Sequence, residues 1–307
     1  MAKKKSELGQ GTSLLQKNAC ASDWVFSTFV CIFLVAIVII VAYPLYFVIV
    51  ASFSEPKDVA MGRTLLAPVG IYMDGYNEIF EHKRIWVAYG NTIFYTIAGT
   101  MLHLLLVIPI AYTLSRKKLM LNGAISIYLL ITMFFSGGTI PLYMALKTYG
   151  LLDTRWVLII SGCISVYNII VARTFFANSI PDDIIEAAEI DGATAMQCFI
   201  RVVLPLSTTI IAVIGLYAAV GYWNAYKPGL MYIRDQSLIP LQVVLREILL
   251  VTDLLAVGNG PEVERQLRLQ EQMRFGLIIV STLPIMILYP CLQRFFAKGV
   301  MIGAIKG

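Results

Sequence analysis

Long apolar runs constrain this chain more than any other feature of its sequence. A membrane-spanning helix needs about 20 mostly apolar residues, because the hydrocarbon core of a bilayer is about 30 Å thick. Six segments meet that requirement, namely residues 25–51, 89–114, 123–146, 156–176, 206–223 and 275–296. Only 14% of the residues are charged and 58% are hydrophobic. The sequence therefore predicts an all-α integral membrane protein with six transmembrane helices.

The third of these segments is interrupted by the sequence SGGTIP at residues 136–141. Glycine and proline are tolerated in membrane helices where neighbouring groups satisfy the freed backbone atoms. We therefore expect a kinked or locally unwound helix here, rather than two separate elements.

Basic residues near the span ends predict the orientation of the chain. The loop at residues 115–122, SRKKLMLN, has three basic residues and no acidic one, which is typical of a cytoplasmic loop. Both termini are then cytoplasmic, and the protein is a multi-pass protein of the cell (plasma or inner) membrane. The expected parts are a cytoplasmic N-terminal segment (1–24), a transmembrane domain (25–296) with a cytoplasmic loop (179–205) and a large extracellular loop (224–274), and a cytoplasmic tail (297–307).

The sequence contains neither an obvious ion-coupling site within the predicted spans nor an ATP-binding motif. These spans contain no Asp, Glu, Lys or Arg well inside the apolar core, and a lone His103 is more typical of a helix–helix hydrogen bond than of a proton relay. The nucleotide-binding pattern G-x-x-x-x-G-K-[ST] is missing. We expect no catalytic site, metal site or cofactor in this chain, and no nucleic-acid binding, because the basic residues form no stripe with aromatic residues. Uphill transport would need another subunit to supply energy.

The acidic segment at residues 179–206, between the fourth and fifth predicted spans, has the pattern helix, glycine turn, helix. Ser179 can cap a helix that Pro181 starts and that ends near Asp191, and Gly192 suits a turn with positive φ. A second helix would present one apolar stripe, formed by Ala195, Phe199, Val202 and Val203. On physical grounds alone, a solvated surface loop and a docking surface fit this segment equally well.

The run EAAEIDGATAMQCFIRVVLP, residues 186–205, resembles the signature loop of permease subunits of binding-protein-dependent ATP-binding-cassette (ABC) importers. The matching residues are Glu186, Ala187, Ala188, Asp191, Gly192, Ala193, Phe199, Leu204 and Pro205. The likeness extends over nearly the whole chain, including NTIFYT at the entry to the second span and the tail AKGVMIGAIKG. It is greatest to the carbohydrate-uptake, maltose-permease-like branch, and within it to the permeases of Gram-positive polysaccharide and oligosaccharide importers. The resemblance implies the type I ABC importer permease fold.

What the resemblance implies is a division of labour between subunits. The loop would form a coupling helix on a separate ATPase, with Glu186, Ala187, Ala188, Asp191, Gly192, Ala193 and Phe199 as coupling residues. Lys298, Gly303 and Lys306 of the tail would also contact the ATPase. A dimer of ATPase subunits would bind ATP and magnesium, and a second, related permease would complete a heterodimeric pore. An extracellular, lipid-anchored solute-binding protein would deliver the carbohydrate.

Candidate residues for the substrate pathway are aromatic or amide side chains within or near the spans, because sugars pack on aromatic rings and hydrogen-bond to amides. They are Asn91, Tyr95, Tyr167, Asn168, Tyr217, Trp223 and Asn224. Helix–helix contacts and an interfacial aromatic belt explain the same residues equally well. Two alternatives stay open for the whole chain: a permease of the same architecture for a non-sugar solute, and an ATPase-independent channel or scaffold protein.

Overall fold

In the computed structural model, residues 21–116, 119–255 and 261–304 are described, and they are almost entirely helical. The chain divides into two compact units, Met1–Tyr72 and Met73–Gly307. Within the described residues, the β structure is a single antiparallel bridge between Ser54 and Ile71.

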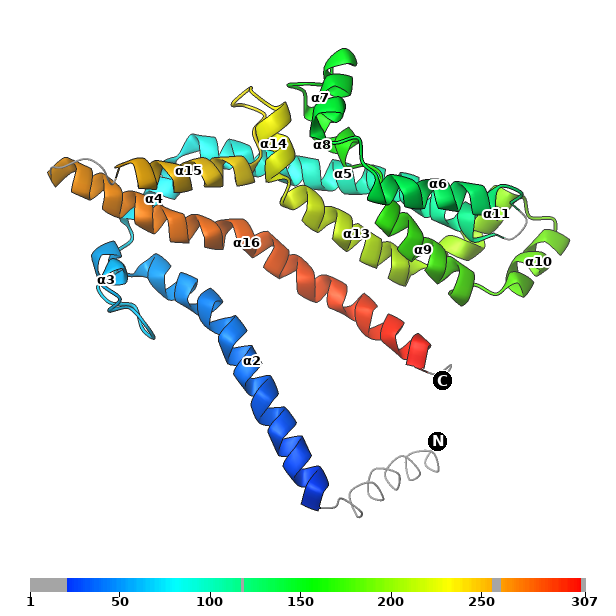
Figure 1. Cartoon of the computed structure of the whole chain (residues 1–307), viewed down its shortest axis with the longest axis horizontal. Helices are drawn as coiled ribbons and strands as arrows, with labels where there is room; N and C mark the ends of the chain where they lie inside the picture. The colour runs from blue at the N-terminus through cyan, green and yellow to red at the C-terminus, as the bar shows by residue number, and fades with distance from the viewer. Residues whose placement is uncertain (1–20, 117–118, 256–260, 305–307) are drawn as a thin grey trace. The chain divides into compact units, whose positions relative to one another are not determined.

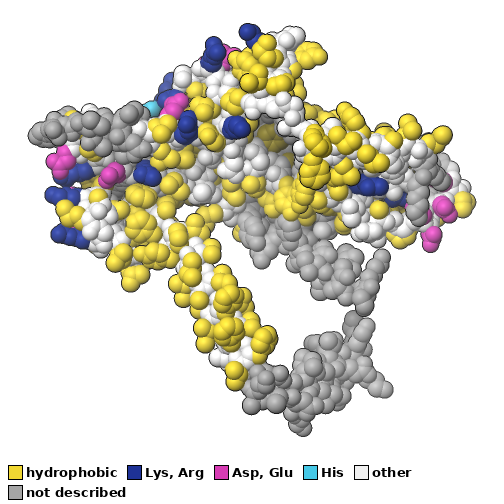
Figure 2. All heavy atoms as spheres, in the orientation of Figure 1, with side chains coloured by type: hydrophobic (Ala, Val, Ile, Leu, Met, Phe, Trp, Pro, Cys, Tyr) yellow, Lys and Arg dark blue, Asp and Glu magenta, His cyan; other side chains and the backbone are white. Residues whose placement is uncertain are grey.

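The first unit consists of α2 (Ala21–Phe53), the short α3 (Pro56–Ala60) and the segment that follows it. Residues Trp24–Phe53 of α2 are long and apolar enough to cross a membrane. Hydrophobic side chains run along the described length of this helix (Figure 2), and a helix that is apolar on all faces is typical of a lipid environment. This helix contains the first predicted span.

The second unit is built from helices that follow one another through short connections (Figure 1). They are α4 (Asp74–Glu81), α5 (Lys83–Ser115), α6 (Asn122–Phe134), α7 (Thr139–Thr148), α8 (Arg155–Ser161), α9 (Val166–Ser179), α10 (Asp182–Ile190), α11 (Ala195–Cys198), the π-helical turn η1 (Phe199–Val203), α12 (Leu204–Leu206), α13 (Thr208–Trp223), α14 (Tyr226–Tyr232), α15 (Leu241–Leu255) and α16 (Pro261–Ala304). The long helix α5 packs against α13, α9, α8 and α15. It is therefore the central element of this unit.

Two clusters of buried apolar side chains hold the second unit together. One joins the first half of α5 to α8 and to α14, α15 and α16 through residues such as Ile85, Leu158 and Leu277. The other joins the second half of α5 to α9, α10 and α13 through residues such as Phe176 and Ile214. Burial of these side chains fixes the helices around α5.

Two helices are long and apolar enough to cross a membrane singly, Trp24–Phe53 and Lys83–Ser115. Three bent pairs pass the same test when each is taken as one span: α6 with α7, α8 with α9, and Ala195–Leu206 with α13. The described residues therefore offer between 2 and 5 spans. The sixth predicted span, residues 275–296, lies inside α16, but most side chains of its second half lie outside the described part. The number of six spans stays a prediction.

The expectation of a continuous, kinked third span was wrong. Helix α6 ends at Phe134, α7 begins at Thr139, and their axes differ by 108°. Gly138, which precedes α7, has a φ of 87°, a conformation that glycine adopts freely and that a helix cannot include. Two consecutive glycines allow the backbone to leave the helix completely.

The sequence predicted one span at residues 156–176 and a large loop at residues 224–274, and the structure differs in both places. Helices α8 and α9 are separate elements that bend by 48° across residues 162–165. The segment 224–274 is largely helical, because it contains α14, α15 and the first part of α16. Breaks in helices leave backbone N–H and C=O groups without intrahelical partners, and these groups must form hydrogen bonds elsewhere. The candidate site lies beside the break between α8 and α9.

Candidate functional site

A cavity of about 730 Å³ lies among α5, α8, α9, α13 and α14 of the second unit. Its volume is typical of pockets that hold small molecules, which measure about 300–1,000 Å³. Apolar residues and glycines form part of its wall, and the polar or aromatic side chains that line it are His103, Ser161, Ser165, Tyr167, Asn168, Tyr217, Tyr222, Asn224, Tyr226 and Lys227. Aromatic faces beside hydrogen-bonding groups suit a ligand with both C–H faces and hydroxyls.

His103 of α5 anchors the break between α8 and α9. Its ring is almost fully buried, with Nδ1 at 3.3 Å from the carbonyl oxygen of Gly162 and Nε2 at 2.9 Å from Nδ2 of Asn168. Because a carbonyl only accepts, Nδ1 carries the proton, and Nε2 accepts from the Asn168 amide. The predicted helix–helix role of His103 is confirmed by these bonds to both sides of the break.

Asn168 is oriented by that histidine. Its Nδ2 donates to His103, so its Oδ1 is the amide atom left to accept a hydrogen bond at the cavity wall. The backbone N–H of Asn168 also lies 3.4 Å from Oγ of Ser165, which caps the start of α9. The break therefore places a fixed acceptor on the cavity wall.

Tyr222 forms a second fixed part of the wall. Its hydroxyl donates to the carbonyl oxygen of Ile159 at 2.8 Å. Its ring lies so close to α5 that a Cβ at Gly99 would be 2.5 Å from the ring, and one at Gly162 would be 3.1 Å away. The two glycines make room for the ring, which determines how closely α13 approaches α5 and α8.

Four of the seven predicted pathway residues come together at this cavity: Tyr167, Asn168, Tyr217 and Asn224. The rings of Tyr167 and Tyr217 lie 6.4 Å apart between centroids, and both are substantially exposed. These two tyrosines come from different helices, α9 and α13. The structure thus groups these residues, and their role in transport stays a prediction.

The other three predicted pathway residues lie elsewhere. Asn91 and Tyr95 are buried in α5 and donate hydrogen bonds to backbone carbonyls, Asn91 to Ser237 at 2.7 Å and Tyr95 to Leu238 at 2.8 Å. Trp223 donates from Nε1 to the carbonyl oxygen of Ser281 at 3.0 Å. Asn91 and Tyr95 therefore join α5 to the segment between α14 and α15, Trp223 joins α13 to α16, and none of the three lines the cavity.

Sequence reasoning did not select Lys227 as a cavity residue. It stands four residues beyond Trp223 in the run GYWNAYKPG, and span-edge lysines are common at membrane interfaces. No sequence signal distinguishes a lysine that turns toward a cavity from one that turns toward solvent. Only the position of α14 against α8 and α15 places it on the wall.

The acidic segment is a second candidate site, and its turn is built as the sequence predicts. Gly192 has a φ of 83°, its N–H donates to Glu189, and the N–H of Ala193 donates to Ala188. This pair of bonds is a Schellman motif, which ends a helix on a left-handed glycine. Thr194 and Gln197 then form a reciprocal capping box at the start of α11. The turn between the two helices is therefore fixed by backbone chemistry.

Helix α10 exposes most of its side chains and buries one. Ile185 enters the apolar cluster, while Asp182, Asp183, Glu186 and Glu189 are exposed. Acidic side chains gather at this end of the second unit (Figure 2). An acidic, solvent-facing helix on an apolar base is a surface that a partner protein can bind.

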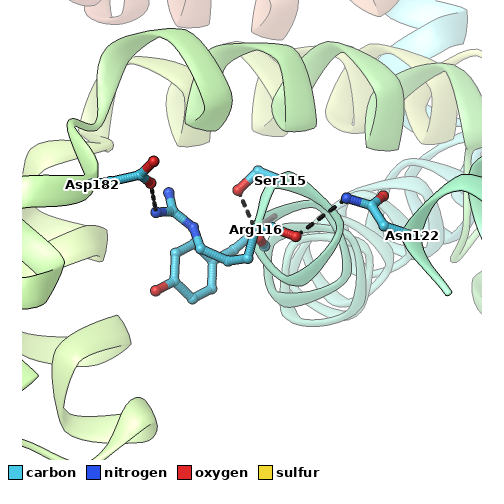
Figure 3. Close-up of polar contacts among 5 residues, drawn as sticks. Ser115, Arg116, Asn122 and Asp182 are labelled. Atoms are coloured by element: carbon cyan, nitrogen blue, oxygen red, sulfur yellow. Dashed lines mark hydrogen bonds and ion pairs between the residues drawn. The ribbon is translucent and has the colours of Figure 1, made fainter. Parts of the chain in front are cut away.

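An ion pair ties the start of α10 to the end of α5. Nη1 of Arg116 lies 3.1 Å from Oδ1 of Asp182, and Figure 3 shows the two side chains pointing toward each other. The guanidinium also stands over the ring of Tyr112, 4.9 Å from its centroid. That ring packs on Phe199, with 5.1 Å between centroids. Tyr112 therefore contacts Phe199 of the second half directly and is linked to α10 of the first half through Arg116.

Two local expectations for this segment were wrong. Ser179 is the last residue of α9, and Pro181 occupies the cap position of α10 without a side-chain bond. The expected apolar stripe also differs at one end: Ala195 is exposed and Cys198 is buried in its place, whereas Val203 is buried as predicted and Phe199 and Val202 are partly buried. The reason is the π-helical turn η1, which inserts one residue and spaces the buried positions by five.

The predicted tail contacts lie largely beyond the described part of the chain. Lys306 lies outside the described residues, and Lys298 and Gly303 fall in α16 where only the backbone is described. Their role stays a prediction.

Comparison with known proteins supports a single family. The chain is 36% identical over 280 residues to the polygalacturonan/rhamnogalacturonan transport system permease protein YtcP of Bacillus subtilis (strain 168), covering 90% of this chain and 96% of YtcP. It is 35% identical to protein LplC of the same organism, covering 90% and 93%. A chain in the crystal structure of a bacterial ABC transporter involved in the import of the acidic polysaccharide alginate superimposes with a TM-score of 0.81 at 30% identity, covering 91% of this chain and 99% of that one. No family profile matches the chain.

Proposed function

The chain belongs to the permease subunits of sugar ABC transporters, and from this premise we propose that it forms the membrane path for a carbohydrate that an extracellular solute-binding protein delivers. The expected substrate is an oligosaccharide. The likeness to a polysaccharide importer over 91% of the chain supports this class of cargo.

The proposed architecture has six spans and both termini in the cytoplasm. The transmembrane domain comprises residues 25–296, with a cytoplasmic N-terminal segment (1–24) and tail (297–307). The acidic segment at residues 179–205 is then cytoplasmic, and residues 224–274 are extracellular. The basic loop at residues 115–122 supports this orientation.

We propose that ATP hydrolysis by the separate ATPase is coupled to this chain through α10 and the turn at Gly192. In this proposal, Glu186, Ala187, Ala188, Asp191, Gly192 and Ala193 dock on a separate ATPase, and Phe199 supports the second helix. The observation that carries the proposal is the position of α10: it is exposed and acidic, it ends on a glycine motif, and Arg116 joins it to the central helix α5. A dimer of ATPase subunits binds ATP and magnesium, and this chain has no enzymatic activity of its own.

The carbohydrate path uses the cavity beside the α8–α9 break, where Tyr167, Asn168, Tyr217 and Asn224 meet. A second, related permease completes a heterodimeric pore, and a lipid-anchored binding protein docks on the extracellular segment. The fixed acceptor on Asn168 and the exposed tyrosine rings support the use of this cavity by a sugar.

Affinity purification from the native membrane tests the proposal directly. We expect an ATPase subunit and a second permease to co-purify, and the purified chain alone to hydrolyse no ATP. The complex, reconstituted in vesicles with its binding protein, should take up an oligosaccharide only when ATP is supplied. Isolation of a stable homo-oligomer with neither an ATPase nor a second permease would refute the proposal.

A further inference from the structure

The charge of the cavity points to the kind of sugar that it holds. Among the residues that line it, Lys227 is the one charged side chain, and none is acidic. Lys227 is exposed and has no ion-pair partner within the part of the chain that the structure describes. An exposed ammonium without an ion-pair partner can bind an anionic group of a ligand that enters the cavity.

The surroundings of Lys227 strengthen the positive potential. The guanidinium of Arg246, on α15, stands over the ring of the neighbouring cavity residue Tyr226, 5.6 Å from its centroid. The next residue, Glu247, is an acid, but it forms an ion pair with Arg84. Among the described residues, no carboxylate forms an ion pair with Lys227 or Arg246.

The remaining polar groups suit the neutral part of a sugar. His103 is held as the neutral tautomer by its bonds to Gly162 and Asn168. The Asn168 amide then offers Oδ1 as an acceptor for a hydroxyl, and the Tyr167 and Tyr217 rings offer faces for C–H groups. A neutral sugar would use these groups but would leave the ammonium of Lys227 without a counter-charge.

We propose that the cavity recognises a sugar with a carboxylate, a uronic acid unit, and that Lys227 binds that carboxylate. The inference rests on the proposed function, because it assigns the cargo of that same cavity. An ammonium–carboxylate hydrogen bond is charge-assisted and stronger than a bond between neutral groups. Lys227 is thus a specificity-determining residue, and the tyrosines and Asn168 bind any sugar unit.

The test is equilibrium binding to the purified transporter complex without its solute-binding protein, whose own selectivity would otherwise mask that of the cavity. The probes are labelled trigalacturonic acid and its fully methyl-esterified form, in which each carboxylate is replaced by an uncharged methyl ester. The variants are Lys227→Met, which removes the charge, and Lys227→Arg, which keeps it. Lys147→Met, at an exposed lysine of α7 outside the cavity, is the matched control.

We expect the wild-type complex and the Lys147→Met control to bind the acid at least about tenfold more tightly than the ester. Lys227→Met should abolish that difference by weakening the binding of the acid alone, and Lys227→Arg should retain most of it. Unchanged binding of the acid by Lys227→Met would overturn the inference. So would an equal loss for both probes, which would indicate a structural role or a lipid headgroup as the partner of Lys227.

Failure of the inference is distinguishable from failure of the proposed function. Binding of both probes with equal affinity by the wild-type complex overturns the role of the carboxylate and leaves a sugar permease in place. If the wild-type complex binds neither probe, the inference is overturned, and ATP-dependent uptake by the same preparation decides separately on the proposed function.

Discussion

Arg116 and Asp182 form an ion pair of 3.1 Å that joins the residue after α5 to the first residue of α10. The same guanidinium contacts the ring of Tyr112, which packs on Phe199 beyond the glycine turn. This cluster joins the acidic segment to the end of α5, the helix that also carries His103 of the cavity. If the acidic segment couples the chain to an ATPase as proposed, Arg116 is a positioning residue for that coupling.

Replacement of Arg116 by alanine should reduce the amount of sugar taken up per ATP hydrolysed. Residues along a coupling network change the coupling free energy by about 0.5–2 kcal/mol, which corresponds to a reduction of about two- to thirtyfold. The thermal stability should fall modestly: the ion pair itself contributes about 0–1 kcal/mol because Asp182 is 57% exposed, but the Arg116 side chain is 17% exposed and its packing on Tyr112 is also lost. Uptake and ATP hydrolysis in reconstituted vesicles measure the ratio.

The control for Arg116→Ala is Asp183→Asn. Asp183 lies in the same turn of α10 and is exposed, and it has no ion pair among the described side chains. Its replacement should leave the ratio unchanged. A wild-type ratio in Arg116→Ala would mean that the ion pair plays no part in coupling.

Gly192→Val should weaken the association with the ATPase. A Cβ at this position meets no atom within 4 Å, so the effect comes from the backbone, whose φ of 83° is strained for a β-branched residue. That strain amounts to about 1–3 kcal/mol and would unwind the end of α10. Gly192→Asn is the matched variant, because asparagine tolerates the left-handed conformation. Co-purification of the ATPase measures the effect, and normal association with wild-type uptake by Gly192→Val would exclude the proposed docking role.

Gly99→Ala should disturb the cavity by displacing the ring of Tyr222, which forms part of its wall. The new methyl group would lie 2.5 Å from the ring of Tyr222, so this ring must move and lose its bond to Ile159. Overpacking of this kind costs about 1–3 kcal/mol, and sugar uptake should fall with the melting temperature. Gly90→Ala, on the same helix with no atom within 4 Å, should leave both unchanged or raise stability. Equal behaviour of the two variants would show that the ring of Tyr222 adjusts freely.

Asp153 should make stability depend on pH only in strong acid. The backbone N–H groups of Asp235 and Arg234 donate to its Oδ1 at 2.8 Å, and they hold the pKa of Asp153 below its ordinary value of 3.8. A carboxylate with a lowered pKa stabilises the fold above its ordinary pKa, and this stabilisation is lost as the pH falls through the lowered value.

Asp153→Ala should therefore lower the unfolding temperature by a constant amount above about pH 5, and the gap should narrow only below the ordinary pKa of the carboxyl group, to the cost of alanine at a φ of 60°. Asp153→Asn keeps an acceptor and tolerates the φ of 60° at this position, so it should be milder. Thermal unfolding in detergent across this pH range measures the gap. A gap that closes near neutral pH would point to another titrating group.

Much of the acidic segment was predictable because its signals are local. The glycine turn at Gly192 and the helix before it depend on residues within one or two turns, and the structure contains both. The π-helical turn after Cys198 was not predictable, since it arises where α11 must meet both the Tyr112 ring and the start of α13. Ser179 reads equally well as a cap or as a helix end, and the extension of α9 decided between them.

The membrane-protein class and the family of this chain follow from its sequence, because apolar run length and the spacing of the acidic motif are one-dimensional properties. Which polar side chains share a cavity depends instead on how the helices pack. His103 and Asn168 are 65 positions apart, and their bond exists because α5 and α9 pack together. Asn91 and Tyr95 looked similar in sequence, yet their face of α5 meets the backbone at residues 237–239. Which helix face opposes which neighbour depends on burial summed over distant segments, and no local pattern encodes that sum.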